Sequence, residues 1–204
     1  MARGRDIPAE YKVSLLSSEF SYDHPFMRLA LHPRLLALVH GYLGMAGWLR
    51  AIDLWWDRPT RGAAKETQLW HRDYDDVMNL KLFVYLNDVD EMAGPFCFLP
   101  QTHPRGLFRA VAPMHDAHLR TTDEQMATVM PSDTWRACTG QAGTAILCDT
   151  CGYHKGLKPI AHDRLLLMIQ YTSPAPYVKR AFSLVDEQTN GLNRLQQCAL
   201  SGAT

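Results

Sequence analysis

The residues between Trp48 and Ser173 form a series of short segments that are rich in aromatic, β-branched and other apolar residues. Such segments are typical of β-strands, and the polar or glycine-containing stretches between them, DEMAG for example, are typical of turns. The strand-like segments are WLRAIDLWWD, TQLWHRDY, NLKLFVYLNDV, GPFCFLPQTH, TWRACTG, GTAILCDT and RLLLMIQYTS. A mainly β fold is therefore predicted, and both a sandwich and a jelly roll fit this pattern.

Helical signals flank the strand-rich region. Apolar residues recur at helical spacing between Pro25 and Tyr42, where Pro33 is expected to divide the segment into two helices and Gly44 to end the second. A capping-box pattern at Thr122 predicts a further short helix, and VDEQTNGLNRLQQCAL predicts a weak C-terminal helix or a loose tail. No repeat or linker divides the 204 residues, so we expect one domain with a helical flank at 1–46, a jelly-roll core at 47–175 and a tail at 176–204.

Composition excludes several classes of protein. The 21 basic residues equal the 21 acidic ones, whereas a protein that binds nucleic acid through its phosphates usually has a basic excess. The N-terminal residues are charged throughout, and the most apolar stretch, LALHPRLLALVHGYLGMAGWL, is interrupted by polar residues, so neither a signal peptide nor a membrane span is expected. Five cysteines without regular spacing are expected to be reduced. We expect a soluble, cytoplasmic protein without nucleic-acid or membrane partners.

A histidine and an aspartate stand two residues apart in the segment WHRDYDD. In a strand, His71 and Asp73 would project from the same face, as two metal ligands must. His154 follows the strand-like GTAILCDT, and Arg164 comes ten residues later, at the start of the last strand-like segment. Two histidines and one carboxylate are typical of non-haem Fe(II) oxygenases, which leave the remaining coordination positions open. Arg164 would then bind the distal carboxylate of a 2-oxoacid, and convergence of such distant residues favours the jelly roll.

Two other metal motifs compete with this interpretation. Cys148, Cys151 and His154 could be three ligands of a zinc site, but a structural zinc site normally has four ligands with paired spacings, and no second pair follows. Cys148 and Cys151 also make a poor redox pair, because the residues after them do not form a helix. His115 and His118 could share a helix face, which is a motif of low specificity.

Four segments in this order resemble the phytanoyl-CoA dioxygenase family of Fe(II)/2-oxoglutarate-dependent oxygenases. They are TQLWHRDYDD, KLFVYLNDVDEMAGPFCFLPQTHPRG, GTAILCDTCGYHKG and HDRLLLMIQYT, and the resemblance covers residues 48–175. It implies a double-stranded β-helix, a cupin-like jelly roll, with iron on His71, Asp73 and His154. The implied cofactors are Fe(II), 2-oxoglutarate and O2.

The resemblance also assigns cosubstrate-binding residues. It implies that Arg164 and Tyr85 bind 2-oxoglutarate, and that a basic residue upstream of the core, for which Lys12 is the nearest candidate, assists. The chain departs from the family at Gly156, where a hydroxyl residue is common, and in PQTH, where Gly-Ser often precedes the histidine. The N-terminal flank is also shorter than usual, so elements that cover the substrate are expected to be reduced or to come from another subunit of a homo-oligomer.

The identity of the carboxylate ligand bears on the reaction. Halogenases that resemble this family have glycine or alanine where this chain has Asp73, so hydroxylation or a related oxidation of a small-molecule metabolite is expected, with release of succinate and CO2. The alternatives are a metal-binding jelly roll without catalysis and a cupin-type enzyme that uses no 2-oxoacid. Arg72, Lys81 and Arg109 are expected to be solvated.

Overall fold

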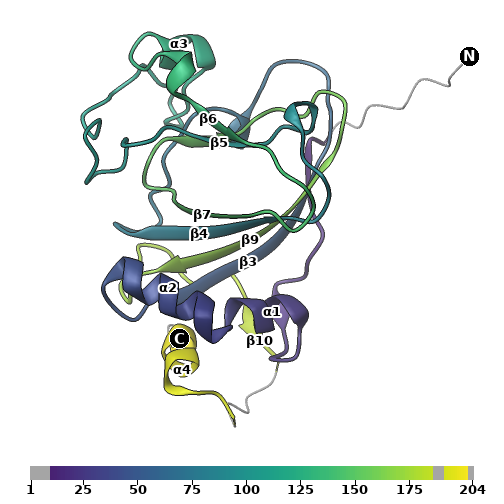
Figure 1. Cartoon of the computed structure of the whole chain (residues 1–204), viewed down its shortest axis with the longest axis vertical. Coiled ribbons are helices and arrows are strands. Elements are labelled where there is room, and N and C mark those ends of the chain that lie inside the picture. Colours follow the sequence, from purple (N-terminus) through teal and green to yellow (C-terminus); the bar gives the residue numbers. More distant parts are fainter. Residues whose placement is uncertain (1–9, 186–190, 202–204) are drawn as a thin grey trace, which may run out of the picture.

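The computed structural model describes residues 10–185 and 191–201. Its helices are α1 (Pro25–Ala30), α2 (Pro33–Leu43), α3 (Asp123–Ala127) and α4 (Arg194–Leu200), and its strands are β1 (Lys12–Ser14), β2 (Glu19–Phe20), β3 (Trp48–Asp57), β4 (Asn79–Tyr85), β5 (Phe96–Phe98), β6 (Arg136–Cys138), β7 (Ala145–Asp149), β8 (His154–Gly156), β9 (Arg164–Thr172) and β10 (Ser183–Leu184). Two layers of β-structure face each other, with α3 above one layer and α1, α2 and α4 beneath the other (Figure 1).

The described strands form a jelly roll. The longer sheet has the order β1-β3-β9-β4-β7, the shorter sheet has the order β6-β5-β8, and β2 pairs separately with β10. After β3 the chain crosses to the shorter sheet, where residue 71 pairs with residue 154, and then returns to β4. It crosses again for β5 and β6, returns for β7, crosses for β8 and returns for β9. This alternation between two sheets is the double-stranded β-helix that was predicted, and the mainly β fold class is confirmed.

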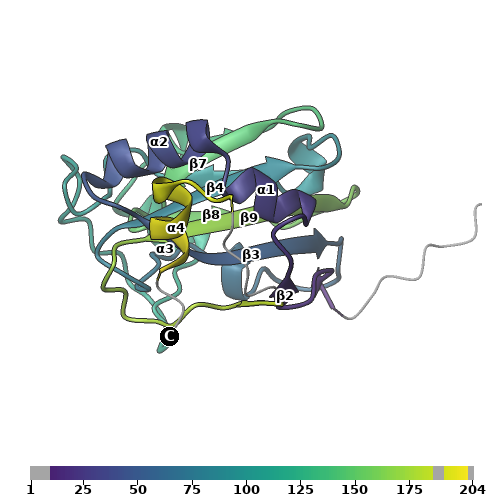
Figure 2. The same cartoon turned by 90° about the horizontal axis from the view of Figure 1, so that it is seen from below.

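The longer sheet has apolar side chains on both faces, because each face is covered. The face toward the helices carries alternate residues such as Leu49, Leu82 and Ile169, which pack against the helical residues Leu36 and Val39. Figure 2 shows α1, α2 and α4 lying across this face. The residues that point between the two sheets form a second cluster: Ala51, Phe83, Tyr85, Phe96, Leu166 and Met168. The space between the sheets is therefore largely filled.

Local signals explain the helices. Pro33 occupies the first turn of α2, and Gly44 ends the helix with a φ of 71°, in the left-handed region that glycine tolerates best. Thr122 caps α3 by accepting a hydrogen bond from the backbone N of Gln125. These predictions are confirmed. The C-terminal helical prediction is confirmed in part by α4, because residues 186–190 lie outside the described residues.

Two segments differ from the prediction. TQLWHRDY is not a regular strand: a single 3-10 turn at Glu66–Gln68 is followed by isolated bridges at Trp70 and His71. The chain leaves the shorter sheet here to reach β4, so its backbone groups bond to several different segments instead of one strand. The residues around His154, which were expected to lie at the mouth of a strand, form β8.

Two further predictions concern the cysteines and the membrane. The five cysteines are free thiols, as predicted. Among the described residues, no helix combines the length and the apolar character needed to cross a membrane.

Candidate metal centre

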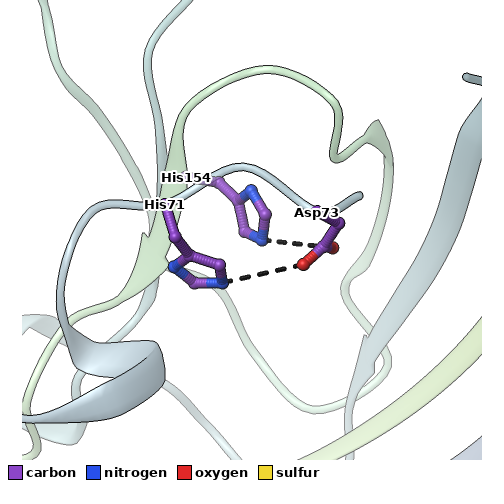
Figure 3. Close-up of side chains that lie close together, drawn as sticks. All are labelled: His71, Asp73 and His154. Carbon is purple, nitrogen blue, oxygen red and sulfur yellow. Dashed lines mark ion pairs between the residues drawn. The ribbon is translucent and has the colours of Figure 1, made fainter. Parts of the chain in front are cut away.

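Three side chains predicted as ligands converge between the two sheets. The Nε2 atom of His71 lies 3.8 Å from Oδ1 of Asp73, and the Nε2 atom of His154 lies 3.5 Å from Oδ2 of the same carboxylate. Figure 3 shows both imidazoles turning these nitrogens toward the carboxylate. Both histidines are buried. One ligand atom from each of the three residues lies within 4.8 Å of the others, so a single metal ion could contact all three.

Backbone hydrogen bonds hold the three residues in place. The backbone N of His71 donates to the O of His154 at 3.0 Å, and the N of His154 donates to the O of His71 at 2.9 Å. Two residues later, the N of Asp73 donates to the O of Thr150 at 2.9 Å. The spacing of two residues therefore brings the side chains together through pairing with the 150–154 segment, although the segment is not a regular strand.

The hydrogen bonds of the histidine rings are those of metal ligands. The Nδ1 atom of His71 lies 2.8 Å from the O of Leu69, and the Nδ1 atom of His154 lies 3.1 Å from the O of Gly152. Because a carbonyl oxygen only accepts, each Nδ1 carries the proton and each Nε2 presents its lone pair to the centre. Burial lowers the pKa of both rings, so both are neutral. Neutral imidazole is the form that binds a metal.

Lys81 forms an ion pair with the carboxylate. Its Nζ lies 2.7 Å from Oδ2 of Asp73, and both side chains are mostly buried. Burial by itself would raise the pKa of Asp73, but the neighbouring side chains, Lys81 first and then His154 and His71, together outweigh burial and hold the pKa well below its usual value. The expectation that Lys81 is solvated is therefore wrong. The carboxylate is ionised, as a metal ligand must be.

A small cavity of about 110 Å³ extends from the three residues toward the start of β9. Lys12 and Trp55 lie on its wall, and the Lys12 Nζ sits 4.0 Å from the centroid of the Trp55 ring. Burial lowers the pKa of Lys12, and no carboxylate of the described residues lies within ion-pair distance of it. The cavity therefore contains an ammonium group without a direct ion-pair partner, although the charge of the more distant Asp57 acts on it.

Arg164 also lines this cavity and is itself buried. Its Nε and Nη2 donate to Oδ2 of Asp57 at 3.1 and 2.9 Å, and its Nη1 donates to the O of Gly94. A guanidinium has five N–H donors, so one on each terminal nitrogen stays free of protein partners among the described residues. A Cβ added at Gly156 would lie 2.7 Å from Nη2. The absence of a side chain at Gly156 thus leaves room beside the guanidinium.

Tyr85 is not brought to the cavity surface. Its hydroxyl donates to the O of Cys138 at 2.7 Å and accepts from the N of Phe96 at 2.9 Å, which joins β4 to β5 and β6. Burial raises the pKa of Tyr85 to about 12. The structure thus gives Tyr85 a role in joining strands, and its contact with a cosubstrate stays a prediction.

A second cluster, formed by His103, Asp149 and Cys151, has the wrong hydrogen bonds for a metal. Nδ1 of His103 accepts from the backbone N of Arg105 at 3.1 Å, so its proton is on Nε2, which lies 3.0 Å from Oδ2 of Asp149. This histidine presents no lone pair to the cluster. Among the described residues, His154 groups with His71 and Asp73 and not with cysteines, so the zinc alternative finds no support.

Sequence reasoning missed two residues of this region, Lys81 and Asp57. Both lie on strands whose alternate residues point between the sheets: Lys81 precedes Phe83 by two positions, and Asp57 follows Trp55 by two. Residues two positions apart in a strand point to the same face, so the inward-facing Phe83 and Trp55 would have predicted that Lys81 and Asp57 also point between the sheets.

A comparison with family models gives one match. The model for the phytanoyl-CoA dioxygenase (PhyH) family matches residues 4–158, a span that contains the three converging residues and ends before Arg164. A search of curated proteins finds no match.

Solved structures share the fold. The carbocyclase SnoK, described as non-heme and alpha-ketoglutarate dependent, is 18% identical, with a TM-score of 0.55 over 85% of this chain and 70% of SnoK. The epimerase SnoN, in complex with Fe3+, alpha-ketoglutarate and nogalamycin RO, is 20% identical, with a TM-score of 0.50 over 82% of this chain and 68% of SnoN. EctD from S. alaskensis with bound Fe is 18% identical, with a TM-score of 0.53 over 87% of this chain and 60% of EctD.

Proposed function

Because the chain belongs to the phytanoyl-CoA dioxygenase family, we propose that it is an Fe(II)- and 2-oxoglutarate-dependent dioxygenase that hydroxylates a C–H bond of a small-molecule metabolite. One observation carries the proposal: two imidazole lone pairs and an ionised carboxylate meet beside a cavity that contains cations. This donor set suits Fe(II), and the cations suit a 2-oxoacid. Structures of the same fold have been solved with iron and alpha-ketoglutarate, which supports the choice of cofactors.

In this proposal His71, Asp73 and His154 hold the iron. Bound Fe(II), with O2 and 2-oxoglutarate, supplies the oxidising chemistry, in which the cosubstrate becomes succinate and CO2. The carbonyl partners of the two Nδ1 atoms fix the rings, and Lys81 fixes the carboxylate. The protein thus supplies neutral imidazoles, an ionised carboxylate and a cavity of about 110 Å³ beside them.

Arg164 binds the distal carboxylate of 2-oxoglutarate in this proposal. The two unused N–H groups, one on each terminal nitrogen, form the fork that pairs with both oxygens of a carboxylate. Asp57 holds the other edge of the guanidinium, so the fork is oriented before the cosubstrate arrives. Lys12 adds a second positive charge on the same cavity.

The reaction type is tested by the product. A panel of small metabolites is incubated with the protein, Fe(II), 2-oxoglutarate and isotopically labelled dioxygen, and succinate and the products are followed by mass spectrometry. We expect one succinate for each molecule of product, and a product that gains a single labelled oxygen atom. A product that loses two hydrogens without gaining oxygen would contradict hydroxylation, and the absence of succinate with every metabolite would contradict the oxygenase assignment.

We expect the Lys81→Met variant to bind metal about 10–100-fold more weakly than the wild type. This is the range seen when a residue that hydrogen-bonds to a metal ligand is removed. Without the ammonium, burial favours the protonated form of Asp73, and protons then compete with the metal. Titration with Co(II), followed by visible absorption, measures the affinity. Lys81→Arg keeps the charge and is the control. Tighter metal binding in Lys81→Met would show instead that Lys81 competes with the metal for the carboxylate.

Gly156→Ser introduces the hydroxyl residue that is common in the family, yet we expect it to weaken 2-oxoglutarate binding. The new Cβ would lie 2.7 Å from Nη2 of Arg164, whose guanidinium is held by Asp57 and cannot move aside freely. The KM for 2-oxoglutarate is expected to rise about tenfold, equivalent to one lost charge-assisted hydrogen bond. A lower KM would show that the guanidinium moves and that the hydroxyl assists.

A further inference from the structure

A second cavity lies outside the candidate metal centre. It has a volume of about 520 Å³ and forms where β3 begins and β9 ends, against the 174–182 segment that follows β9. Figure 2 shows this segment leaving the sheet before the chain returns to the edge where β2 lies. The volume is within the range of small-molecule binding pockets. We call this cavity the Arg50 pocket.

The Arg50 pocket is positively charged. Among the described residues its lining includes Arg50, Lys179 and Arg180, and no carboxylate. The guanidinium of Arg180 has a protein partner, because its Nη2 donates to the O of Leu200. No acidic residue of the described lining balances the charges of Arg50, Lys179 and Arg180, so the pocket would attract an anion.

The remaining lining residues are suited to a flat apolar group. Trp48 and Tyr177 contribute aromatic rings, and Pro174 and Pro176 contribute rigid apolar surface. Tyr177 is 71% exposed, so its ring is available to a ligand. Aromatic side chains next to cations form a site for an organic anion with a ring-bearing body.

Hydrogen bonds connect the Arg50 pocket to the metal centre. Nη1 of Arg50 donates to Oε1 of Gln170 at 2.9 Å, and Nε2 of Gln170 donates to Oδ2 of Asp75 at 2.7 Å. The backbone O of Asp75 accepts from the N of Tyr177 at 2.9 Å. Asp75 does not line the pocket, but it is two residues from Asp73, so these hydrogen bonds link the pocket wall to the segment that carries a candidate iron ligand.

We propose that the Arg50 pocket binds the anionic end of the substrate, and that the substrate is a small organic acid with an aromatic or polycyclic body. The inference rests on the proposed function, because it names the substrate class of the same site. The charged end is held at Arg50 and Lys179, while the body extends past Asp75 to the iron.

The first test uses 2-naphthoate as the probe and metal-free protein. Binding is measured by isothermal titration calorimetry, with the uncharged 2-naphthalenemethanol as the matched ligand and Arg34→Gln, a change on the exposed surface of α2, as the matched variant. We expect Arg50→Gln and Lys179→Gln each to weaken naphthoate binding about tenfold, and the alcohol to bind at least tenfold more weakly than the acid. Equal binding of the acid and the alcohol, or wild-type binding in both variants, would overturn the proposal.

A second measurement tests the link to the metal. Co(II) is bound to the wild-type protein, and saturating naphthoate is expected to shift the visible absorption of Co(II). Arg50→Gln should need about tenfold more naphthoate for the same shift. No shift in the wild type would show that the pocket is separate from the metal centre and would overturn its role in substrate binding. Since the first test needs no metal, its failure is distinguishable from failure of the oxygenase assignment.

Discussion

His71→Ala will abolish metal-dependent turnover of 2-oxoglutarate. Its Nε2 is one of two imidazole lone pairs at the centre, and no other described residue replaces it there. Removal of a residue that hydrogen-bonds to a metal ligand lowers metal affinity or activity about 10–100-fold, and removal of the ligand itself must lower them further. We therefore expect a loss of at least about 100-fold in both Co(II) affinity and succinate formation.

The matched control is His103→Ala. His103 belongs to the other histidine-containing cluster, but its Nδ1 accepts from the backbone N of Arg105, so it is not poised to bind metal. This variant is expected to keep wild-type metal affinity while it loses the contact with Asp149. Equal loss of metal affinity in the two variants would contradict the assignment of the centre, as would full activity in His71→Ala.

Arg164→Met is expected to have two effects. The first is a rise of about 100-fold in the KM for 2-oxoglutarate, because two charge-assisted hydrogen bonds to its carboxylate are lost. The second is a loss of stability of about 3 kcal/mol, at the low end for a broken buried ion pair, because Asp57 stays buried while the nearby Lys12 compensates for part of its charge. Cosubstrate kinetics and urea denaturation measure the two effects.

A double variant separates the two roles of Arg164. Adding Asp57→Asn to Arg164→Met removes the uncompensated charge, so we expect most of the lost stability to return. The KM for 2-oxoglutarate should stay high, since the fork is still absent. A double variant with normal KM would contradict the role of Arg164 in cosubstrate binding, and one that stays as unstable as Arg164→Met would contradict the pairing with Asp57.

The sequence predicted the parts of the centre that depend on residue type and spacing. His71, Asp73 and His154 were singled out because two histidines and a carboxylate are typical of non-haem iron sites, and the structure brings these three side chains together. The strand-rich region predicted a mainly β fold, and the arrangement of the motifs favoured the jelly roll over a sandwich, although TQLWHRDY proved irregular. Its backbone bonds to several segments, and such pairing depends on the tertiary structure, which local propensity does not encode.

The residues that tune the centre were harder to predict. A charged residue in a strand-like segment usually faces solvent, so Lys81 was expected to be solvated, whereas its strand lies in the middle of a covered sheet. Asp57 was overlooked for a different reason. Its partner Arg164 is distant in sequence, and the register of β3 and β9 is what makes the two residues adjacent. The assignment of Tyr85 came from the resemblance alone: its hydroxyl bonds to the backbone of Cys138 and Phe96, and its contact with the cosubstrate stays a prediction.

An anaerobic titration of the purified protein with Fe(II) and 2-oxoglutarate tests the central claim most directly. If His71, Asp73 and His154 hold iron and the cosubstrate chelates it, wild-type protein will develop a weak visible charge-transfer band that saturates with 2-oxoglutarate. His154→Ala will show no band, while His103→Ala will behave as the wild type. No band in the wild-type protein, or an undiminished band in His154→Ala, would contradict the account.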